Sequence, residues 1–326
     1  MHVLVIGAAG MVGAKLIARL CTDGRLGRQE IKRLTRHDIV IAPPPPASLF
    51  AIDTFASDLS LPGEAERLLA GRPDVIFHLA AIVSGEAEAD FDKGYRINLD
   101  GTRLLFDAIR KLGNYTPRLV FTSSIAVFGA PFPDQIGDEF FTTPLTSYGT
   151  QKAICELLLS DYSRRGFIDG VGLRFPTICV RPGKPNLAAS GFFSGIIREP
   201  LAGQEAILPV PDDVRHWHAS PRAAVQFLVH AATLDTSLLG SRRNVTLPGI
   251  SCTVGEQIEA LRKVAGEQAV RRIRREPNAA IMKIVAGWPR NFSAKRGTEL
   301  GFRAEASFEE IIRVHIEDEL GSRIST

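Results

Sequence analysis

Three glycines near the start of the chain constrain its fold more than any other feature. They stand in Gly7-Ala8-Ala9-Gly10-Met11-Val12-Gly13, between an apolar run, Val3–Ile6, and an amphipathic stretch, Met11–Leu20. Glycine permits a tight turn and a close backbone approach, and a helix that follows offers free N–H groups and the positive end of its dipole. The arrangement predicts a strand–turn–helix unit that holds the pyrophosphate of a dinucleotide, although G-x-x-G-x-x-G differs from the usual G-x-G-x-x-G.

Short apolar runs continue to alternate with helical stretches through the first half of the chain. Further strands are predicted at Ile31–Thr35, Phe50–Ala56, Asp74–Leu79, Arg118–Phe121 and Val171–Phe175. Helices are predicted at Met11–Leu20, Gly63–Ala70, Leu99–Leu112 and Tyr148–Ser163. This alternation predicts an α/β fold with a doubly wound parallel sheet that helices cover on both faces.

The pattern changes after Pro176. An irregular stretch rich in Pro and Gly is followed by a helix opening at Ser220-Pro221, a strand at Asn244–Leu247 and two late helices. Capping boxes mark the starts of those helices, at Thr253/Glu256 and Ser307/Glu310. We therefore divide the chain into a cofactor-binding domain with the catalytic residues, 1–175, and a smaller α/β substrate-binding or lid region, 176–326, interleaved with the first.

Composition excludes several classes of protein. The 326 residues are enough for about two domains, and 45% hydrophobic with 23% charged residues is typical of a globular protein. A net charge of +3 without long runs of one sign does not favour nucleic acid as a partner. No apolar run approaches the roughly 18 residues of a membrane span, and the N-terminus does not resemble a signal peptide. Four scattered cysteines fit a reducing environment, so we expect a cytoplasmic protein.

Acidic residues after two predicted strands bear on the choice of cofactor. Asp38 could accept hydrogen bonds from both ribose hydroxyls of NAD and would repel the 2′-phosphate of NADP. Arg36 and His37 beside it favour NADP, and on balance the sequence favours NAD. Asp58-Leu59 could bracket the adenine, although Asp58 could equally cap a helix.

A tyrosine and a lysine are spaced for acid–base chemistry. Tyr148 and Lys152 stand four residues apart on a predicted helix and so share one face. An ammonium ion near a tyrosine lowers the pKa of the phenol, which can then exchange protons with a C–OH/C=O pair. Ser123-Ser124 follows a predicted strand at the sheet edge where active sites form, so a hydroxyl there could hold the reacting oxygen. The alternatives are an exposed helix face and an ordinary turn serine.

Six segments of the first half occur in an order that is specific as a set. They are Gly7-x-x-Gly10-x-x-Gly13, Asp58-Leu59, His78–Ala81, Asn98–Thr102, Phe121–Gly129 and Tyr148–Lys152. With these segments the chain resembles the extended short-chain dehydrogenase/reductases, which include nucleotide-sugar epimerases and dehydratases. The resemblance implies a Rossmann domain that binds NAD, with Tyr148 as acid/base, Lys152 on the nicotinamide ribose and Ser124 on the reacting oxygen. The cofactor-binding residues it implies are Gly7, Gly10, Met11, Val12, Gly13, Asp38, Asp58, Leu59, Leu79, Ala80, Ala81, Asn98, Tyr148, Lys152 and Pro176.

Other segments point to a subgroup of that family. Ile82–Asp92, Val180–Asn186 and Ile197–Leu201 resemble members that oxidise the C2 hydroxyl of a four-carbon sugar acid to a 2-keto acid. The stretch Arg215–Arg222 departs from the R-D-[FY]-[IV]-[HY]-V-x-D segment usual in nucleotide-sugar members. The alternatives are a nucleotide-sugar 4-epimerase or dehydratase with tightly bound NAD, and a non-enzymatic cofactor sensor, which would not need the Ser/Tyr/Lys set.

The substrate site and the oligomer are predicted less directly. A carboxylate fits the guanidinium fork of Arg181 or Arg215. The full set of expected substrate contacts is Ser84, Ser124, Tyr148, Arg181, Asn186 and Arg215. His216 and His218 share a strand face, but no third ligand has a suitable spacing, and we expect no metal. The resemblance implies a homodimer, for which apolar helix faces are available, although burial against the sheet explains those faces equally well.

Overall fold

The computed structural model describes residues 1–45, 47–183 and 190–321, in two compact units. The first unit comprises Met1–Val127, Thr146–Arg174 and Val225–Thr246. The second comprises Phe128–Leu145, Phe175–Ala224 and Leu247–Thr326.

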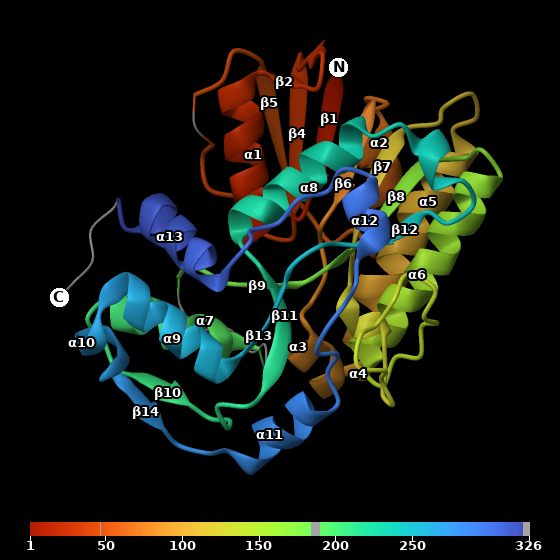
Figure 1. Cartoon of the computed structure of the whole chain (residues 1–326). Coiled ribbons are helices and arrows are strands. Elements are labelled where there is room, and N and C mark those ends of the chain that lie inside the picture. Colours follow the sequence, from red (N-terminus) through yellow and green to blue (C-terminus); the bar gives the residue numbers. More distant parts are fainter. Residues whose placement is uncertain (46, 184–189, 322–326) are drawn as a thin grey trace. The chain divides into compact units, whose positions relative to one another are not determined.

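A seven-stranded parallel sheet forms the centre of the first unit (Figure 1). Its strands, in spatial order, are β12 (Asn244–Thr246), β8 (Asp169–Phe175), β7 (Arg118–Ser124), β6 (Val75–His78), β1 (His2–Ile6), β4 (Arg33–Asp38) and β5 (Ala51–Ala56). The chain builds outward from β1 in one direction through β4 and β5, and in the other through β6, β7 and β8. The predicted doubly wound sheet is thus confirmed, and its switch point lies between β1 and β6, where ligands of open α/β sheets bind.

Helices cover both faces of this sheet. Alternate strand residues such as Leu4, Ile76 and Phe121 pack into one core with the helices α2 (Glu64–Leu69), α5 (Gly101–Lys111) and α6 (Ser147–Arg164). Val3 and Val5 are also buried and point to the opposite face, where α1 (Met11–Asp23) lies (Figure 1). Burial on both faces explains why these strands read as nearly continuous apolar runs.

Most predicted elements differ from the structure by a few residues at their ends, and two of these differences bear on the site. The second long strand is Arg33–Asp38 and not Ile31–Thr35, because His2 pairs with Arg33 and a short hairpin of β2 (Arg25–Leu26) and β3 (Gln29–Glu30) occupies the preceding residues. Asp38 is therefore the last residue of its strand. The helix expected from Leu99 begins earlier, as the π-helical turn η1 (Tyr95–Asp100), and continues as α5.

Several short elements of the first unit were not predicted. After β6 the chain forms α3 (Ser84–Ala89) and α4 (Phe91–Gly94), and after β7 the 3-10 turn η2 (Ile125–Val127). A second 3-10 turn, η3 (Thr236–Leu239), precedes β12. The helix α8 (Pro221–Thr233) starts in the second unit and ends in the first, and Ser220 caps it by accepting the Ala223 N–H at 2.9 Å, as expected.

The second unit combines small sheets with helices around its own core. One sheet has the order β13 (Ile250–Thr253), β11 (Arg215–Ala219), β9 (Thr177–Ile178), and a second pairs β10 (Ala206–Leu208) with β14 (Ile273–Arg275). Its helices are α7 (Gly191–Leu201), α9 (Val254–Ala265), α10 (Glu267–Val270), α11 (Ala279–Ala286), α12 (Lys295–Glu299) and α13 (Phe308–Glu319). The core between them includes Phe193, Ile197, Leu261 and Ile312.

The two predicted capping boxes differ in the structure. Thr253 and Glu256 form the full reciprocal box at the start of α9. At the start of α13, Ser307 accepts the Glu310 N–H at 3.2 Å, but the Glu310 carboxylate binds the N–H of Ala306 and not that of Ser307. The hydroxyl cap is confirmed there, and the reciprocal bond is replaced by one to the preceding residue.

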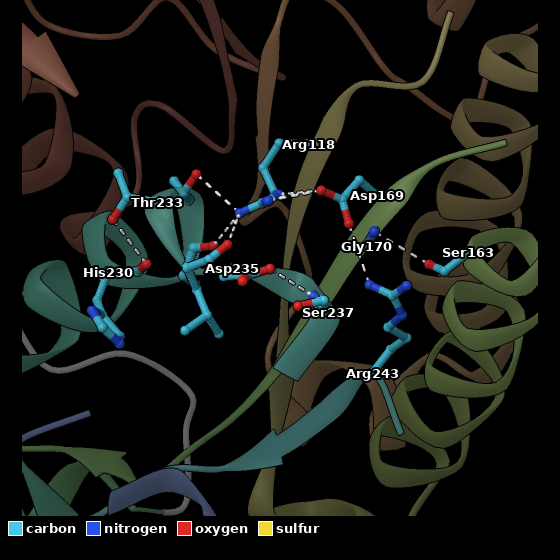
Figure 2. A network of polar contacts seen from close by, with 12 residues as sticks. Arg118, Ser163, Asp169, Gly170, His230, Thr233, Asp235, Ser237 and Arg243 are labelled. Carbon is cyan, nitrogen blue, oxygen red and sulfur yellow. Dashed lines mark hydrogen bonds and ion pairs between the residues drawn. The ribbon is translucent and has the colours of Figure 1, made fainter. Parts of the chain in front are cut away.

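An arginine anchors the end of α8 to the amino-terminal edge of the main sheet (Figure 2). Arg118, the first residue of β7, binds Asp169, the first residue of β8, at 2.7 Å. Its other terminal nitrogen donates to the carbonyl oxygens of Ala231, Ala232 and Leu234 at 2.9–3.1 Å. These carbonyls lie at the helix end, where the last four have no partner inside the helix. Arg118 therefore supplies a charged cap to α8.

Arg118→Met is expected to lower the free energy of unfolding by about 2–3 kcal/mol, because three carbonyl groups lose a charged donor and Asp169 loses one of its arginines. Urea denaturation measures the change. Arg164→Gln is the matched control, since Arg164 pairs only at the exposed surface with Asp161. Equal stability of the two variants would contradict this role of Arg118.

Candidate active site

Backbone hydrogen bonds attach the glycine loop to the main sheet. The N–H groups of Gly7 and Ala8 donate to the carbonyl of His37 at 2.8 and 3.0 Å, which fixes the loop on β4. Gly7 has φ +96°, and a Cβ there would lie 2.7 Å from the backbone nitrogen of Ala80. A Cβ at Gly13 would overlap the carbonyl oxygen of Gly7. Both glycines are thus required by the packing of the protein itself.

Gly10 differs from these two glycines. A Cβ at this position would meet nothing nearer than the Gly7 oxygen at 3.5 Å, among the described residues. Gly10 is also the N-cap of α1, a helix start without a side-chain cap or an acidic residue in its first turn, so that Met11 and Val12 open the helix uncapped. Space above a bare helix N-terminus is what a diphosphate needs. The loop therefore fits the pyrophosphate of a dinucleotide.

The residues at the end of β4 fit NAD and not NADP. The Asp38 carboxylate accepts the N–H of Ala9 at 2.8 Å, which places it beside the glycine loop. Arg36 is buried and donates to the Pro43 carbonyl at 2.6 Å and to Thr54 at 2.7 Å. His37 is buried against Ser57, and this burial lowers the pKa of its imidazole. The two basic residues that favoured NADP in the sequence are therefore turned into the protein.

Asp58 does not cap α2, whose N-cap is Gly63. Its carboxylate accepts the N–H and the hydroxyl of Ser60 at 2.9 and 2.6 Å, and binds Arg96 at 2.5 Å. The neighbouring Leu59 is buried in the core. The helix-capping alternative is thus wrong, and Asp58 holds the turn after β5 against the π-helical turn η1.

The segment after β6 is held by a backbone bond to β1 and by the side-chain amide of Asn98. The Leu79 N–H donates to Ile6 at 2.8 Å, and Ala80 lies against Gly7, while Ala81 continues toward Ile82. Asn98 accepts the Ile82 N–H at 2.9 Å, and its Nδ2 donates to the Ile82 carbonyl and to Gln151 at 3.3 and 2.8 Å. Since Gln151 precedes Lys152 in α6, Asn98 links the segment beside the glycine loop to the helix with the predicted acid/base.

The helix α6 starts with two caps. Thr146 accepts the Gly149 N–H at 3.1 Å, and the Glu88 carboxylate from α3 accepts the N–H of Ser147 at 2.9 Å. Tyr148, half-buried, follows in the first turn. Neither cap residue was singled out from the sequence. The contact from Glu88 joins elements far apart in the chain, whereas Thr146, a threonine directly before the helix, is a local signal that could have been used.

Lys152 lies inside the protein, only 2% exposed. Its Nζ donates to the Thr122 carbonyl at 2.8 Å and lies 4.7 and 5.8 Å from the ring centres of Phe121 and Tyr148. Burial lowers the pKa of this ammonium to about 8. An exposed helix face, the alternative for this pair, is therefore excluded for Lys152, and its charge lies close enough to Tyr148 to stabilise a phenolate.

The two serines at the end of β7 have separate contacts. Ser124 is half-buried at the carboxyl end of the strand, and its Oγ accepts the Ala126 N–H at 3.1 Å. The Ser123 hydroxyl is buried and donates to Glu156 at 2.6 Å. Glu156 was missed in the sequence, although it stands one further turn along α6 from Lys152.

The remaining predicted contacts are spread over both units. Ser84 opens α3 in the first unit, and Pro176 is buried directly after β8 at the start of the second. Arg181 donates to the Ile178 carbonyl and to Ser190 at 3.0 and 3.1 Å. Arg215 donates to the Ser251 carbonyl at 3.1 Å and pairs with Glu256 at 3.2 Å. Asn186 lies outside the described residues.

The paired histidines of β11 belong to the core of the second unit. His216 bonds to Thr177 at 2.7 Å and to the Pro289 carbonyl at 3.0 Å, and His218 contacts Gln257 at 3.0 Å. Burial lowers the pKa of His216 to about 4, so neither a solvated nor a charged role fits this side chain. In the part of the chain that the structure describes, no group of three or more His, Cys, Asp or Glu could hold a metal ion, and no helix could cross a membrane.

Comparison with known proteins agrees with this geometry. The model of the NAD dependent epimerase/dehydratase family matches residues 3–221. D-erythronate dehydrogenase from Cupriavidus necator is 48% identical over 98% of both chains, and D-erythronate dehydrogenase from Haemophilus influenzae is 39% identical over 97% of this chain and 99% of that one. The crystal structure of a nucleoside-diphosphate-sugar epimerase from Agrobacterium tumefaciens has TM-score 0.98 and 68% identity, covering 100% of this chain and 96% of that one.

Gly10→Ala is expected to weaken NAD binding about tenfold or more, since the added Cβ would enter the space that we expect the diphosphate to occupy. Its Tm should fall by no more than a few degrees, because the position has room. Calorimetric titration and thermal unfolding measure the two effects. Gly13→Ala is the contrast, and should lose both binding and stability. Wild-type NAD affinity in Gly10→Ala would place the diphosphate elsewhere.

Proposed function

The chain belongs to the NAD-dependent epimerase/dehydratase family, and on this basis we propose that it is an NAD-dependent dehydrogenase of a small sugar acid. The substrate is D-erythronate or a close four-carbon relative, oxidised at its C2 hydroxyl to the 2-keto acid. The observation that carries this proposal is the likeness to two D-erythronate dehydrogenases over nearly the whole chain, at 48% and 39% identity.

The proposed chemistry assigns one task to each catalytic side chain. Tyr148, as phenolate, removes the proton of the C2 hydroxyl, and the hydroxyl of Ser124 holds the same oxygen. The buried Lys152 ammonium, 5.8 Å from the centre of the Tyr148 ring, stabilises the phenolate and would bind the nicotinamide ribose. Bound NAD would supply the acceptor for the hydride of C2. Orientation of the substrate by these groups supplies a further part of the rate.

The proposed cofactor site follows the two loops at the switch point. The glycine loop with Met11 and Val12 holds the diphosphate, and Asp38 accepts the ribose hydroxyls. The residues Asp58, Leu59, Leu79, Ala80, Ala81, Asn98 and Pro176 complete the proposed set. Asn98 takes part through the segment that its amide fixes, since both Nδ2 protons and Oδ1 already bind protein groups.

A nucleotide-sugar epimerase is the second candidate. The structure from Agrobacterium tumefaciens that carries this description is 68% identical to the chain, which favours it. The segment Arg215–Arg222 argues against it, because it lacks the acidic residue that follows Arg in the nucleotide-sugar pattern. In this segment His216 and His218 pack on Phe193 in the core of the second unit.

Substrate contacts, oligomer and location remain predictions. Ser84 and the guanidinium groups of Arg181 and Arg215 stay candidates for the hydroxyl and carboxylate groups of the substrate, as does Asn186. A homodimer through α5 and α6 fits the outward side chain of Leu157, which is 71% exposed on α6. All four cysteines are buried and free, as a reducing cytoplasm allows.

The substrate is tested by NADH absorbance with purified protein and NAD. D-erythronate, D-threonate, L-threonate and a UDP-hexose form the panel. Growth of NADH with one four-carbon acid is the expected result and identifies the substrate. No NADH from any acid, together with conversion of the UDP-hexose, would replace the dehydrogenase by the epimerase.

Tyr148→Phe is expected to lower kcat by about 10²–10⁴-fold, the usual effect of losing a general acid/base. NAD affinity should stay near the wild-type value, because the diphosphate and adenosine contacts are untouched. Tyr162→Phe on the same helix is the control, since Tyr162 binds Asp107 and takes no part in the proposed chemistry. Near-normal turnover of Tyr148→Phe would remove the tyrosine from the mechanism.

A further inference from the structure

A buried carboxylate lies next to the catalytic set without a role in it. Glu156 is 3% exposed and stands on α6 one turn beyond Lys152 and two turns beyond Tyr148. Residues at i, i+4 and i+8 lie along one side of a helix. The face that carries the proposed chemistry therefore continues into an ionised group inside the protein.

The contacts of Glu156 join three elements. Arg174 of β8 forms a two-pronged pair with its carboxylate, at 2.9 Å from Nε and 2.7 Å from Nη2. The Ser123 hydroxyl of β7 donates to the same carboxylate at 2.6 Å. All three groups are inside the first unit, with Ser123 and Glu156 each 3% exposed.

A buried ion pair of this kind is poor support for stability. Removing two charges from water costs several kcal/mol, and well-packed apolar residues often stabilise a core as much or more. Such groups are better explained where they fix one arrangement of the elements they join, because no other arrangement satisfies the buried charge. The pair at Glu156 is therefore better explained by the arrangement of α6 on the sheet than by stability.

Two successive residues of β7 bind the buried charged side chains of α6. The Thr122 carbonyl accepts from Lys152, and the Ser123 hydroxyl binds Glu156. Two neighbouring strand residues thus hold two side chains one turn apart on α6. Sliding or rotating the helix would break both bonds and leave the Lys152 charge and the Ser123 hydroxyl buried without these partners. The next strand residue is Ser124, and the preceding helix turn holds Tyr148.

We propose that Glu156 is a positioning residue, which acts through Ser123 to hold α6 in the one register on β7 that brings Tyr148 and Ser124 to the same substrate oxygen. Arg174 acts with it by balancing the charge. The inference rests on the proposed roles of Ser124, Tyr148 and Lys152. Glu156 itself touches neither substrate nor cofactor.

Ser123→Ala tests the proposal with little disturbance, since it removes one hydroxyl and leaves the ion pair. We expect kcat to fall by about 10–100-fold, in the range that small misplacements of reacting groups produce, with NAD affinity unchanged. Ser163→Ala is the matched control. Ser163 is also a buried hydroxyl of α6, but it binds Leu159 and Gly170 at the far end of the helix.

The two variants separate positioning from stability. We expect both to lose some Tm and only Ser123→Ala to lose kcat. Equal kcat in both, at a similar loss of Tm, would reduce Glu156 to a structural residue. A second pair, Glu156→Gln and Glu156→Ala, gives the same answer independently, because only Gln keeps an acceptor for Ser123 and should retain the higher kcat.

A second measurement tests the positioning role of Glu156 even if the proposed function is wrong. If wild-type protein makes no NADH from any sugar acid, hydrogen–deuterium exchange decides the positional claim without substrate. Ser123→Ala should then speed amide exchange in residues 119–126 and in the first turns of α6, while Ser163→Ala should not. Unchanged exchange at both sites would overturn the proposal.

Discussion

The catalytic edge of the sheet depends on how one buried ammonium group is accommodated. Lys152 donates to the Thr122 carbonyl, and its Nζ lies 4.7 and 5.8 Å from the ring centres of Phe121 and Tyr148. A charge left unpaired at this depth would cost several kcal/mol, so α6 must lie where the carbonyl is within reach. That requirement links the end of β7, with Ser124, to the first turn of α6, with Tyr148. One turn further along α6, Glu156 binds Ser123 and supports the same position of α6 on β7.

The cofactor side has a comparable constraint, at the switch point of the sheet. Gly7 approaches Ala80 so closely that no side chain fits, and Asp38 bonds to the loop through Ala9. Dehydrogenation and epimerisation both begin with removal of a proton and a hydride from a C–OH group, so the proposed roles of these residues and of the Ser/Tyr/Lys set would serve either reaction. The distinction rests on the segment Arg215–Arg222, which departs from the nucleotide-sugar pattern. The likeness to two D-erythronate dehydrogenases, at 48% and 39% identity, agrees with it.

The sequence predicted those features of the site that depend on residues close together in the chain. The strand–glycine–helix unit and the Tyr148/Lys152 face follow from the periods of strand and helix. Arg36 and His37 favoured NADP in the sequence. Their partners Thr54, in β5, and Ser57, directly after it, come near only in the folded sheet. The bond from Ser123 to Glu156 spans 33 residues and has no local signature. Most of the second unit was missed because its sheets are made of short strands from distant segments.

In the proposed reaction the hydride is transferred from the substrate to NAD and is not returned. The direct measurement uses D-erythronate carrying deuterium at C2, with NAD in excess, and locates the label by mass spectrometry. We expect one deuterium in free NADH for each 2-keto acid formed, and a slower rate than with unlabelled acid if hydride removal limits turnover. Deuterium that stays on the sugar acid, or that appears on an inverted product without free NADH, would exclude the dehydrogenase reaction.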